Sequence, residues 1–394
     1  MPNTTYYFMP LTELEFLLIT GISQAVKKTN GGKTVLLHTA HPRIVNKMQN
    51  YYDQFDEVIQ LPFCDYQNNL IKGYKKFLIA WSIVRKLPFD SDRVLFNCSG
   101  RQLINMLVLH HFRKKRGQTR TTFAQILPYP DAKAGMPISL RRSLPMNAYS
   151  LFLGKMIFYR HEPGYPDYYG YISKPDWDVK LYVEHEGNAE KGLNFQNTPS
   201  TLEFIDTKRL DDAKCNDFDK PGVIVFVDDR TPHVYGLSEK GYWEFIKILC
   251  SHISQKMCLP VYVKMHPACP DNLLKEKGID AIILNKNIVA EEYYLLKRKQ
   301  ILGIFSTGST ALLSGAWLGI PAFNFSALVG YEAKMLSRML TYLAHPAIKH
   351  LTCIADLKNL KFPPGSANAE KQCSKEATWA KIITKISECS EKNT

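Results

Sequence analysis

The chain has 394 residues, of which 45% are hydrophobic and 22% are charged, and its formal net charge is +13. This length exceeds one ordinary hydrophobic core and predicts two domains of about 150 to 200 residues each. The composition excludes collagen-like, low-complexity and repeat proteins, and the positive charge favours polyanions or an anionic membrane surface as partners.

Cysteine usage and the first residues predict a cytoplasmic protein. The nine cysteines are odd in number and form no C-x-x-C pair, as expected for reduced thiols. The stretch MPNTTYYFMPLTELEF lacks the basic end and apolar run of a secretion signal. No apolar run approaches the roughly 18 residues of a membrane-spanning helix.

The first 130 residues alternate between strand and helix patterns. Apolar, β-branched and aromatic runs predict strands at 4–9, 33–38, 57–61, 93–98 and 121–127. Helical patterns lie between them at 12–28, 43–52, 69–86 and 102–113. This repeated strand–helix order predicts a mostly parallel sheet that helices cover on both faces.

The middle of the chain has a different texture. Residues 128–175 are rich in Pro, Tyr and Gly and predict either an irregular surface connection or an aromatic wall that faces a sugar substrate. A strand at 178–183 then leads into Glu184-His185-Glu186-Gly187. The polar segment 194–220 predicts the interdomain linker, so the expected domains are 1–215 and 216–394.

The second half repeats the α/β pattern. Strands are predicted at 223–227, 260–265, 281–284 and 301–305, with helices at 239–256, 271–277 and 290–299. The predicted fold class is therefore α/β, with two Rossmann-like domains that face each other across a cleft. Ligands of such domains bind at the carboxyl ends of the strands.

A hydroxyl-rich turn follows the strand at 301–305, and it consists of Ser306, Thr307, Gly308, Ser309 and Thr310. Backbone N–H groups at the start of a helix lack intrahelical partners, and the helix dipole favours anions there. The turn therefore predicts a phosphate site. The structural alternative is an N-cap, in which the hydroxyls bind only the amides of their own helix.

His266-Pro267 directly follows another predicted strand, so its imidazole would lie at the same sheet edge as the turn. Two further His-Pro pairs occur. His41-Pro42 lies near a strand end in the first domain and would be structural or face an acceptor, and His345-Pro346 lies in a late loop and is predicted to be structural. Position alone distinguishes His266.

These features, with the segments ILNKNIVAEEYYLL and FSTGSTALLSGAWLGIPAFNF, resemble the donor half of bacterial GT-B glycosyltransferases that use CMP-activated sugars, the sialyltransferase and polysialyltransferase-like group. The resemblance covers residues 223–325. It implies that the His266 imidazole contacts the donor phosphate and that Ser306, Thr307, Ser309 and Thr310 bind CMP. It also implies an acidic element before a glycine as the source of the base, for which this chain has the interrupted Glu184-His185-Glu186-Gly187.

Transfer of a sugar requires a carboxylate that removes the proton of the acceptor hydroxyl and donors that stabilise the departing phosphate. Either Glu186 or the Asp228-Asp229 pair is predicted to be the base, and spacing does not separate them. Each could instead be a solvated turn carboxylate. Glu291 or Glu292 is predicted to accept from ribose hydroxyls, although the helix dipole alone also favours Glu at a helix start.

The sequence thus predicts a metal-independent, inverting glycosyltransferase without a cofactor. Its donor would be a CMP-sugar with sialic acid or a related 2-keto sugar acid, bound by the domain 216–394. Its acceptor would be a glycan or glycolipid of capsule or lipooligosaccharide synthesis, bound by the domain 1–215. One alternative is a CDP-alditol phosphotransferase of capsule or teichoic-type polymer synthesis, and another is a non-catalytic protein that binds nucleotide or polyanion.

The densest basic run, His110 to Arg120, together with Arg141-Arg142, is either a solvated helix end or a surface for peripheral contact with the inner face of a membrane. Nucleic acid is not expected as a partner, because the run lacks interleaved aromatic residues.

Overall fold

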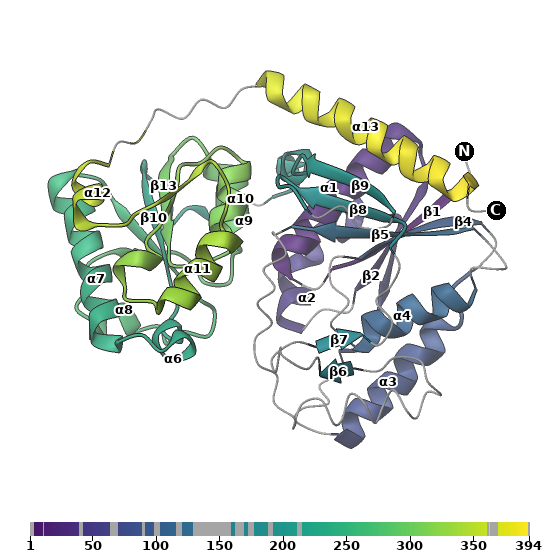
Figure 1. Cartoon of the computed structure of the whole chain (residues 1–394), viewed down its shortest axis with the longest axis horizontal. Helices are drawn as coiled ribbons and strands as arrows, with labels where there is room; N and C mark the ends of the chain where they lie inside the picture. The colour runs from purple at the N-terminus through teal and green to yellow at the C-terminus, as the bar shows by residue number, and fades with distance from the viewer. Residues whose placement is uncertain are drawn as a thin grey trace. The chain divides into compact units, whose positions relative to one another are not determined.

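The chain folds into two compact units, which are coloured by residue number in Figure 1. The first comprises Met1–Ile205 with Cys373–Thr394, and the second comprises Asp206–Gln372. The computed structural model describes residues 4–10, 12–38, 42–63, 70–88, 91–97, 103–115, 120–128, 159–161, 169–171, 177–187, 192–210, 215–360, 362 and 369–392.

The first unit is built on a seven-stranded sheet with the order β3-β2-β1-β4-β5-β8-β9, and every neighbouring pair in it is parallel. Its strands are β1 (Thr4–Met9), β2 (Lys33–His38), β3 (Glu57–Gln60), β4 (Asp92–Asn97), β5 (Thr121–Leu127), β8 (Val179–Val183) and β9 (Leu193–Thr198). Except for β3, which lies at an edge, the apolar runs predicted as strands occupy the interior of the sheet, as expected for a parallel sheet that is buried on both faces.

Helices cover this sheet. α1 (Glu13–Thr29) begins with a capping box in which Thr12 and Glu15 exchange hydrogen bonds, and it ends with basic residues. α3 (Leu70–Val84) and α4 (Leu103–Lys114) bury apolar residues in a common core with β1, β2 and β4. The predicted helix at 43–52 is instead α2 (Pro42–Met48) followed by a 3-10 helix (Gln49–Gln54).

The predicted linker at 194–220 begins inside the sheet. β9, with the sequence LNFQNT, is an edge strand that pairs with β8 alone. Its polarity is that of an edge with one exposed side, because water can solvate the unpaired groups there. Because of this polar composition, the sequence pattern predicted a linker where β9 lies. The units divide at Ile205, ten residues before the expected boundary at 215.

Most of the last described helix, α13 (Ala369–Lys392), belongs to the first unit, which includes Cys373–Thr394. Trp379 Nε1 donates to the carbonyl oxygen of Pro199 at 2.8 Å, and Ser387 Oγ lies 2.9 Å from Tyr6 Oη. Lys28 on α1 pairs with Glu376 at 3.0 Å. The expected domain 216–394 therefore differs from the observed second unit, which ends at Gln372.

The second unit is built on a six-stranded sheet with the order β12-β11-β10-β13-β14-β15, and every neighbouring pair is parallel. Its strands are β10 (Gly222–Val227), β11 (Val261–Met265), β12 (Ile282–Ile283), β13 (Ile301–Ser306), β14 (Ala322–Asn324) and β15 (Ile348–His350). Its helices are α6 (Thr231–Tyr235), α7 (Glu239–Ser251), α8 (Leu273–Glu276), α9 (Ala290–Lys297), α10 (Ala311–Trp317), α11 (Ala333–Tyr342) and α12 (Ile354–Lys358).

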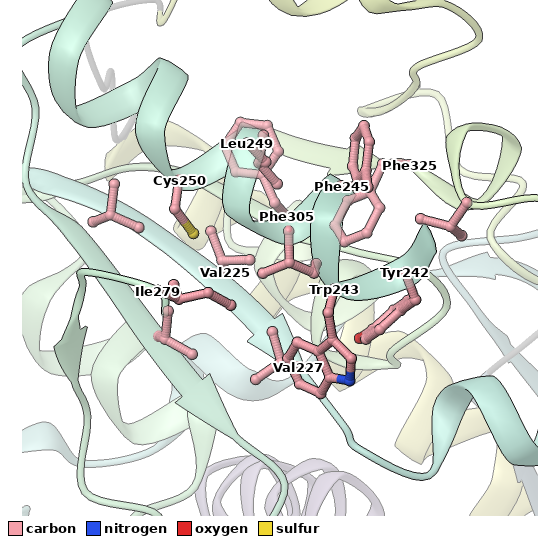
Figure 2. Packing of buried hydrophobic residues seen from close by; sticks show 14 of the residues in the cluster. Val225, Val227, Tyr242, Trp243, Phe245, Leu249, Cys250, Ile279, Phe305 and Phe325 are labelled. Carbon is pink, nitrogen blue, oxygen red and sulfur yellow. The ribbon is translucent and has the colours of Figure 1, made fainter. Parts of the chain in front are cut away.

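The core of the second unit lies between its sheet and α7. Figure 2 shows Val225 and Val227 of β10 facing Trp243 and Leu249 of α7, with Phe305 of β13 in the same cluster. α7 begins at the N-cap Ser238, whose hydroxyl accepts from the Gly241 amide. This hydrogen bond defines the start of the helix. This packing holds the end of β10 in place against α7.

Part of the segment 128–175 forms a two-stranded antiparallel ribbon of β6 (Tyr159–His161) and β7 (Tyr169–Tyr171). The rest of that predicted aromatic wall lies outside the described residues, as do His41 and Arg141-Arg142.

His38 lies at the end of β2, and its burial is expected to make the protein less stable in acid. It is fully buried, its Nδ1 lies 2.5 Å from Tyr52 Oη, and burial lowers its pKa to about 4. An unfolded histidine titrates near pH 6.5, so the unfolded state binds more protons and stability falls as the pH drops from 6.5 to 4, by up to about 3 kcal/mol. Urea unfolding of His38→Gln is expected to show a flatter pH profile in this window.

A matched control is His233→Gln, because the side chain of His233 is 73% exposed. This variant is expected to keep the slope of the wild-type protein. An unchanged slope in His38→Gln would contradict the assignment of the acid loss to His38.

Candidate functional site

The candidate site lies at the carboxyl edge of the second sheet. The sheet order places β10 between β11 and β13. The chain runs from β10 to β11 and β12 on one side, and then crosses to β13 on the other side of β10. Such a switch point opens a crevice outside the strand ends, where ligands of α/β sheets bind. His266 follows β11, Asp228 follows β10 and Ser306 ends β13. Because neighbouring strands lie about 4.8 Å apart, the loops after β11 and β13 flank that of β10 within about 10 Å.

Two hydroxyls of the turn after β13 bind the turn's own backbone. Ser306 Oγ accepts from the Ser309 amide at 3.2 Å and from the Gly308 amide at 3.4 Å. Ser309 Oγ accepts from the Ala311 amide at 3.2 Å, at the start of α10. Ser309 therefore binds the first amide of α10, as the structural alternative of capping predicts, whereas Ser306 binds amides of the turn itself. Ser306 and Thr307 are buried, whereas Gly308, Ser309 and Thr310 are partly exposed, so the last three form the accessible side of the turn.

A buried network behind the turn, which no sequence motif indicates, holds the shape of the turn. Ser326 Oγ donates to the carbonyl oxygen of Thr307 at 2.7 Å, and its amide donates to Asn324 Oδ1 at 3.0 Å. Asn324 Nδ2 lies 3.0 Å from His350 Nδ1. Asn324 ends β14 and is 1% exposed, and Ser326 is fully buried. A fully satisfied polar network of this kind rigidifies its surroundings.

His266 is held at the strand end by its own backbone. Its amide donates to the carbonyl oxygen of Val227 at 2.9 Å, which ties β11 to β10. Its Nδ1 accepts from the Ala268 amide at 3.1 Å. A neutral ring therefore carries its proton on Nε2, which becomes the hydrogen-bond donor of the imidazole. His345 has the same local turn, with Nδ1 accepting from the Ala347 amide at 3.2 Å.

Asp228 is bound by Arg230, a residue that the sequence analysis did not select. Arg230 Nε and a terminal nitrogen donate to the two carboxylate oxygens at 2.9 and 2.7 Å. Burial raises the pKa of Asp228, but the hydrogen bonds from Arg230 and the charge of His266 lower it more, so this pKa lies below its usual value. A carboxylate with a lowered pKa and a bidentate partner is a weak proton acceptor.

Asp229 accepts from the thiol of Cys269, whose Sγ lies 3.3 Å from Asp229 Oδ1. One ligand atom each from Asp228, Asp229 and Cys269 lies within 4.8 Å of the others, which is a spacing that a metal ion could use. However, burial raises the pKa of the Cys269 thiol to about 11, and metals bind the thiolate. Arg230 binds Asp228, and Asp229 and Cys269 bind each other, so each of the three residues has a partner within the protein.

Glu291 lies in the first turn of α9 and is 5% exposed. It accepts from Ser314 Oγ on α10 at 2.7 Å. This contact joins the two helices, and a role of Glu291 in binding ribose stays a prediction.

The segment Glu184 to Gly187 follows β8 in the first unit. Glu184 has a positive φ of 56° and its Oε1 accepts from the Ser200 amide, so its carboxylate supports the local backbone. Glu186 is exposed. A side chain at Gly187 would meet the ring of Tyr182 at 1.8 Å, so only glycine fits there. The two glutamates thus differ, because Glu186 is exposed whereas Glu184 is only partly exposed.

In the described part of the chain, no helix combines the length and the apolar character needed to cross a membrane.

The chain resembles known proteins in structure but not in sequence. No protein-family model matches the chain, and no curated protein sequence does. Among solved structures, a provisionally assigned UDP-N-acetylglucosamine 2-epimerase from Listeria monocytogenes has a TM-score of 0.52 at 11% identity, covering 100% of this chain and 98% of the other. A UDP-GlcNAc 2-epimerase from Neisseria meningitidis, solved with UDP-GlcNAc, has a TM-score of 0.50 at 11% identity, covering 97% and 98%.

A galactoside α-2,3-sialyltransferase from Photobacterium phosphoreum has a TM-score of 0.46 at 12% identity, covering 92% and 100%. That score is too low to support an argument. The two parallel sheets and the likeness to the epimerases confirm the predicted α/β fold of the GT-B type.

Proposed function

We propose that the protein is a metal-independent, inverting glycosyltransferase that moves sialic acid or a related 2-keto sugar acid from a CMP-sugar to a glycan acceptor. The observation that carries the proposal is the arrangement at the switch point of the second sheet. There the His266 imidazole and the Ser306–Thr310 turn follow the two strands that flank β10. The second unit would bind the donor and the first unit the acceptor.

In this proposal the donor phosphate lies between His266 and the turn. His266 Nε2 donates to a phosphate oxygen, and Pro267 fixes the backbone that follows. On the accessible side of the turn, the hydroxyls of Ser309 and Thr310 supply further donors beside Gly308, while Ser306 and Thr307 shape the turn. These groups stabilise the charge that develops on CMP as its bond to the anomeric carbon breaks.

The base in this proposal is Glu186. The acceptor hydroxyl attacks the anomeric carbon, and its proton passes to the Glu186 carboxylate. Asp228 is the weaker candidate because Arg230 holds both of its oxygens and its pKa is lowered. Asp229 stays a candidate, since its described partner is only the Cys269 thiol. The proposal assigns no role to a metal, since the group of Asp228, Asp229 and Cys269 found among the described residues is held by protein partners.

The observation that favours a second candidate is the fold likeness to two UDP-GlcNAc 2-epimerases. An epimerase that acts on a UDP-sugar would use the same sheet edge for uridine phosphates. A CDP-alditol phosphotransferase would use it for cytidine phosphates. The nucleotide and the product therefore separate the three enzymes, and a non-catalytic nucleotide-binding protein would give no product.

The melting temperature of the protein with CMP, CDP, UMP, UDP or GDP tests the proposal, because a ligand that binds only the folded state raises it. We expect the largest rise with CMP, about 5 to 11 °C for a ligand near 100 times its Kd that stabilises the second unit. A rise with UDP alone would favour the epimerase, and no rise with a cytidine nucleotide would contradict the donor assignment. Phosphate retained in the product linkage would indicate the phosphotransferase.

A further inference from the structure

The helix α3 exposes two large apolar side chains to solvent. Leu78 is 41% exposed and Ile79 is 53% exposed, whereas Phe77 and Ala80 beside them are 1% and 0% exposed. The apolar pair thus lies on the outward side of a helix whose inward side already fills the core. Exposed apolar residues that adjoin on a helix mark an interaction surface more often than scattered ones do.

Cations surround this pair. Lys75, Lys76, Arg85 and Lys86 are all exposed, and no acidic residue occurs between Asp65 and Asp90. A solvated helix face usually carries charges of both signs, which stabilise the helix through pairs at spacings of three and four. Trp81 is partly buried at the rim of this face, with the Arg85 guanidinium 6.0 Å from its ring. The absence of acids therefore sets α3 apart from an ordinary solvated helix.

The neighbouring helix α4 extends the positive charge. Trp81 on α3 packs edge-on against His111 on α4, with ring centroids 6.1 Å apart, and Figure 1 shows the two helices side by side. Residues 70–130 contain twelve Lys and Arg against two Asp, a net charge of +10 out of +13 for the chain. The charge of the protein is thus concentrated in the region of α3 and α4.

We infer that the outward face of α3 and of the turn that follows it, formed by Lys75, Lys76, Leu78, Ile79, Arg85 and Lys86, binds an anionic phospholipid surface. Leu78 and Ile79 enter the boundary between headgroups and acyl chains, the cations contact acidic headgroups, and Trp81 lies at the interface. Nucleic acid would use the cations but gain nothing from the apolar pair. This inference is independent of the proposed enzymatic activity.

Co-sedimentation of the full chain with vesicles tests it. We expect binding to vesicles of phosphatidylcholine with phosphatidylglycerol, weaker binding as salt is raised, and none to phosphatidylcholine alone. Leu78→Ser with Ile79→Ser is expected to weaken binding by about tenfold or more. Replacing the four cations by glutamine is expected to weaken it by more than about 100-fold, because each contributes about fivefold near such a surface.

Matched controls come from the second unit. Ile248 and Ile354 are 51% and 55% exposed, so Ile248→Ser with Ile354→Ser removes the same kind of apolar area. The charge control replaces four other exposed lysines by glutamine: Lys256, Lys275, Lys349 and Lys358. Both controls are expected to bind like the wild-type protein, and circular dichroism verifies the fold of every variant. Equal loss in control and α3 variants, equal binding to neutral vesicles, or binding to RNA but not to vesicles would overturn the inference.

Discussion

Replacing His266 by alanine is expected to lower turnover of CMP-sialic acid by about 10²- to 10³-fold, the effect of removing one preorganised donor from a developing anion. The melting temperature without ligand should change little, because the described contacts that hold this loop are largely backbone hydrogen bonds. The amide of residue 266 keeps its bond to Val227, and Cys269 keeps its bond to the carbonyl oxygen of residue 266. Release of CMP measures the turnover.

The control for this experiment is His345→Ala. His345 also precedes a proline and also accepts the amide two residues later, but it follows no strand of the second sheet. Its removal deletes the same local hydrogen bond without touching the switch point, so turnover should stay near that of the wild-type protein. Equal losses of turnover in the two variants would assign the effect to the loop backbone. Unchanged turnover in His266→Ala would contradict the proposed role of the imidazole.

Glu186→Gln is expected to reduce transfer to a glycan acceptor by about 10²- to 10⁴-fold, because the amide cannot take the acceptor proton. Glu186 is exposed, and the neighbouring Glu184 carboxylate is the one that binds the Ser200 amide, so the fold should be retained. The rise in melting temperature with CMP should also be retained, since Glu186 belongs to the first unit. Initial rates with saturating donor measure the effect.

Three further variants complete the comparison. Glu388→Gln changes an exposed carboxylate on α13 of the same unit and should leave the rate unchanged. Asp228→Asn removes the partner of Arg230, so it should lower the melting temperature as well as the rate. If Asp229→Asn abolishes transfer while Glu186→Gln does not, the base is Asp229 and the assignment to Glu186 is wrong.

The strands of both sheets could largely be predicted from the sequence because their interiors are continuous apolar runs. Such runs have few alternatives in an α/β fold. β9 could not be recognised in the same way, since an edge strand is half solvated and its sequence resembles that of a loop. The position of α13 could not be predicted at all. An amphipathic pattern identifies a helix, but only the contacts of Trp379 and Ser387 decide which sheet it covers.

The same distinction applies to the candidate site. That the Ser306–Thr310 turn and His266 share a sheet edge follows from strand order, and the sequence indicated it. Arg230 lies two residues from Asp228, so that pair could have been found from local chemistry. The bond between Cys269 and Asp229 spans 40 residues. The difference between Glu184 and Glu186 depends on a positive φ and on Ser200, which composition does not reveal.

The packing of α13 has a consequence for how the protein is made. The first unit begins at the start of the printed sequence, yet its covering helix is translated only after the whole second unit. Until then the groups that contact α13, which include Tyr6, Lys28 and the carbonyl oxygen of Pro199, lack these partners on the nascent chain. Synthesis runs from the N-terminus, so the later unit can finish folding first and the earlier one last. A ribosome that stops after residue 372 would release a chain with one completed unit and one exposed apolar surface, a substrate for chaperones.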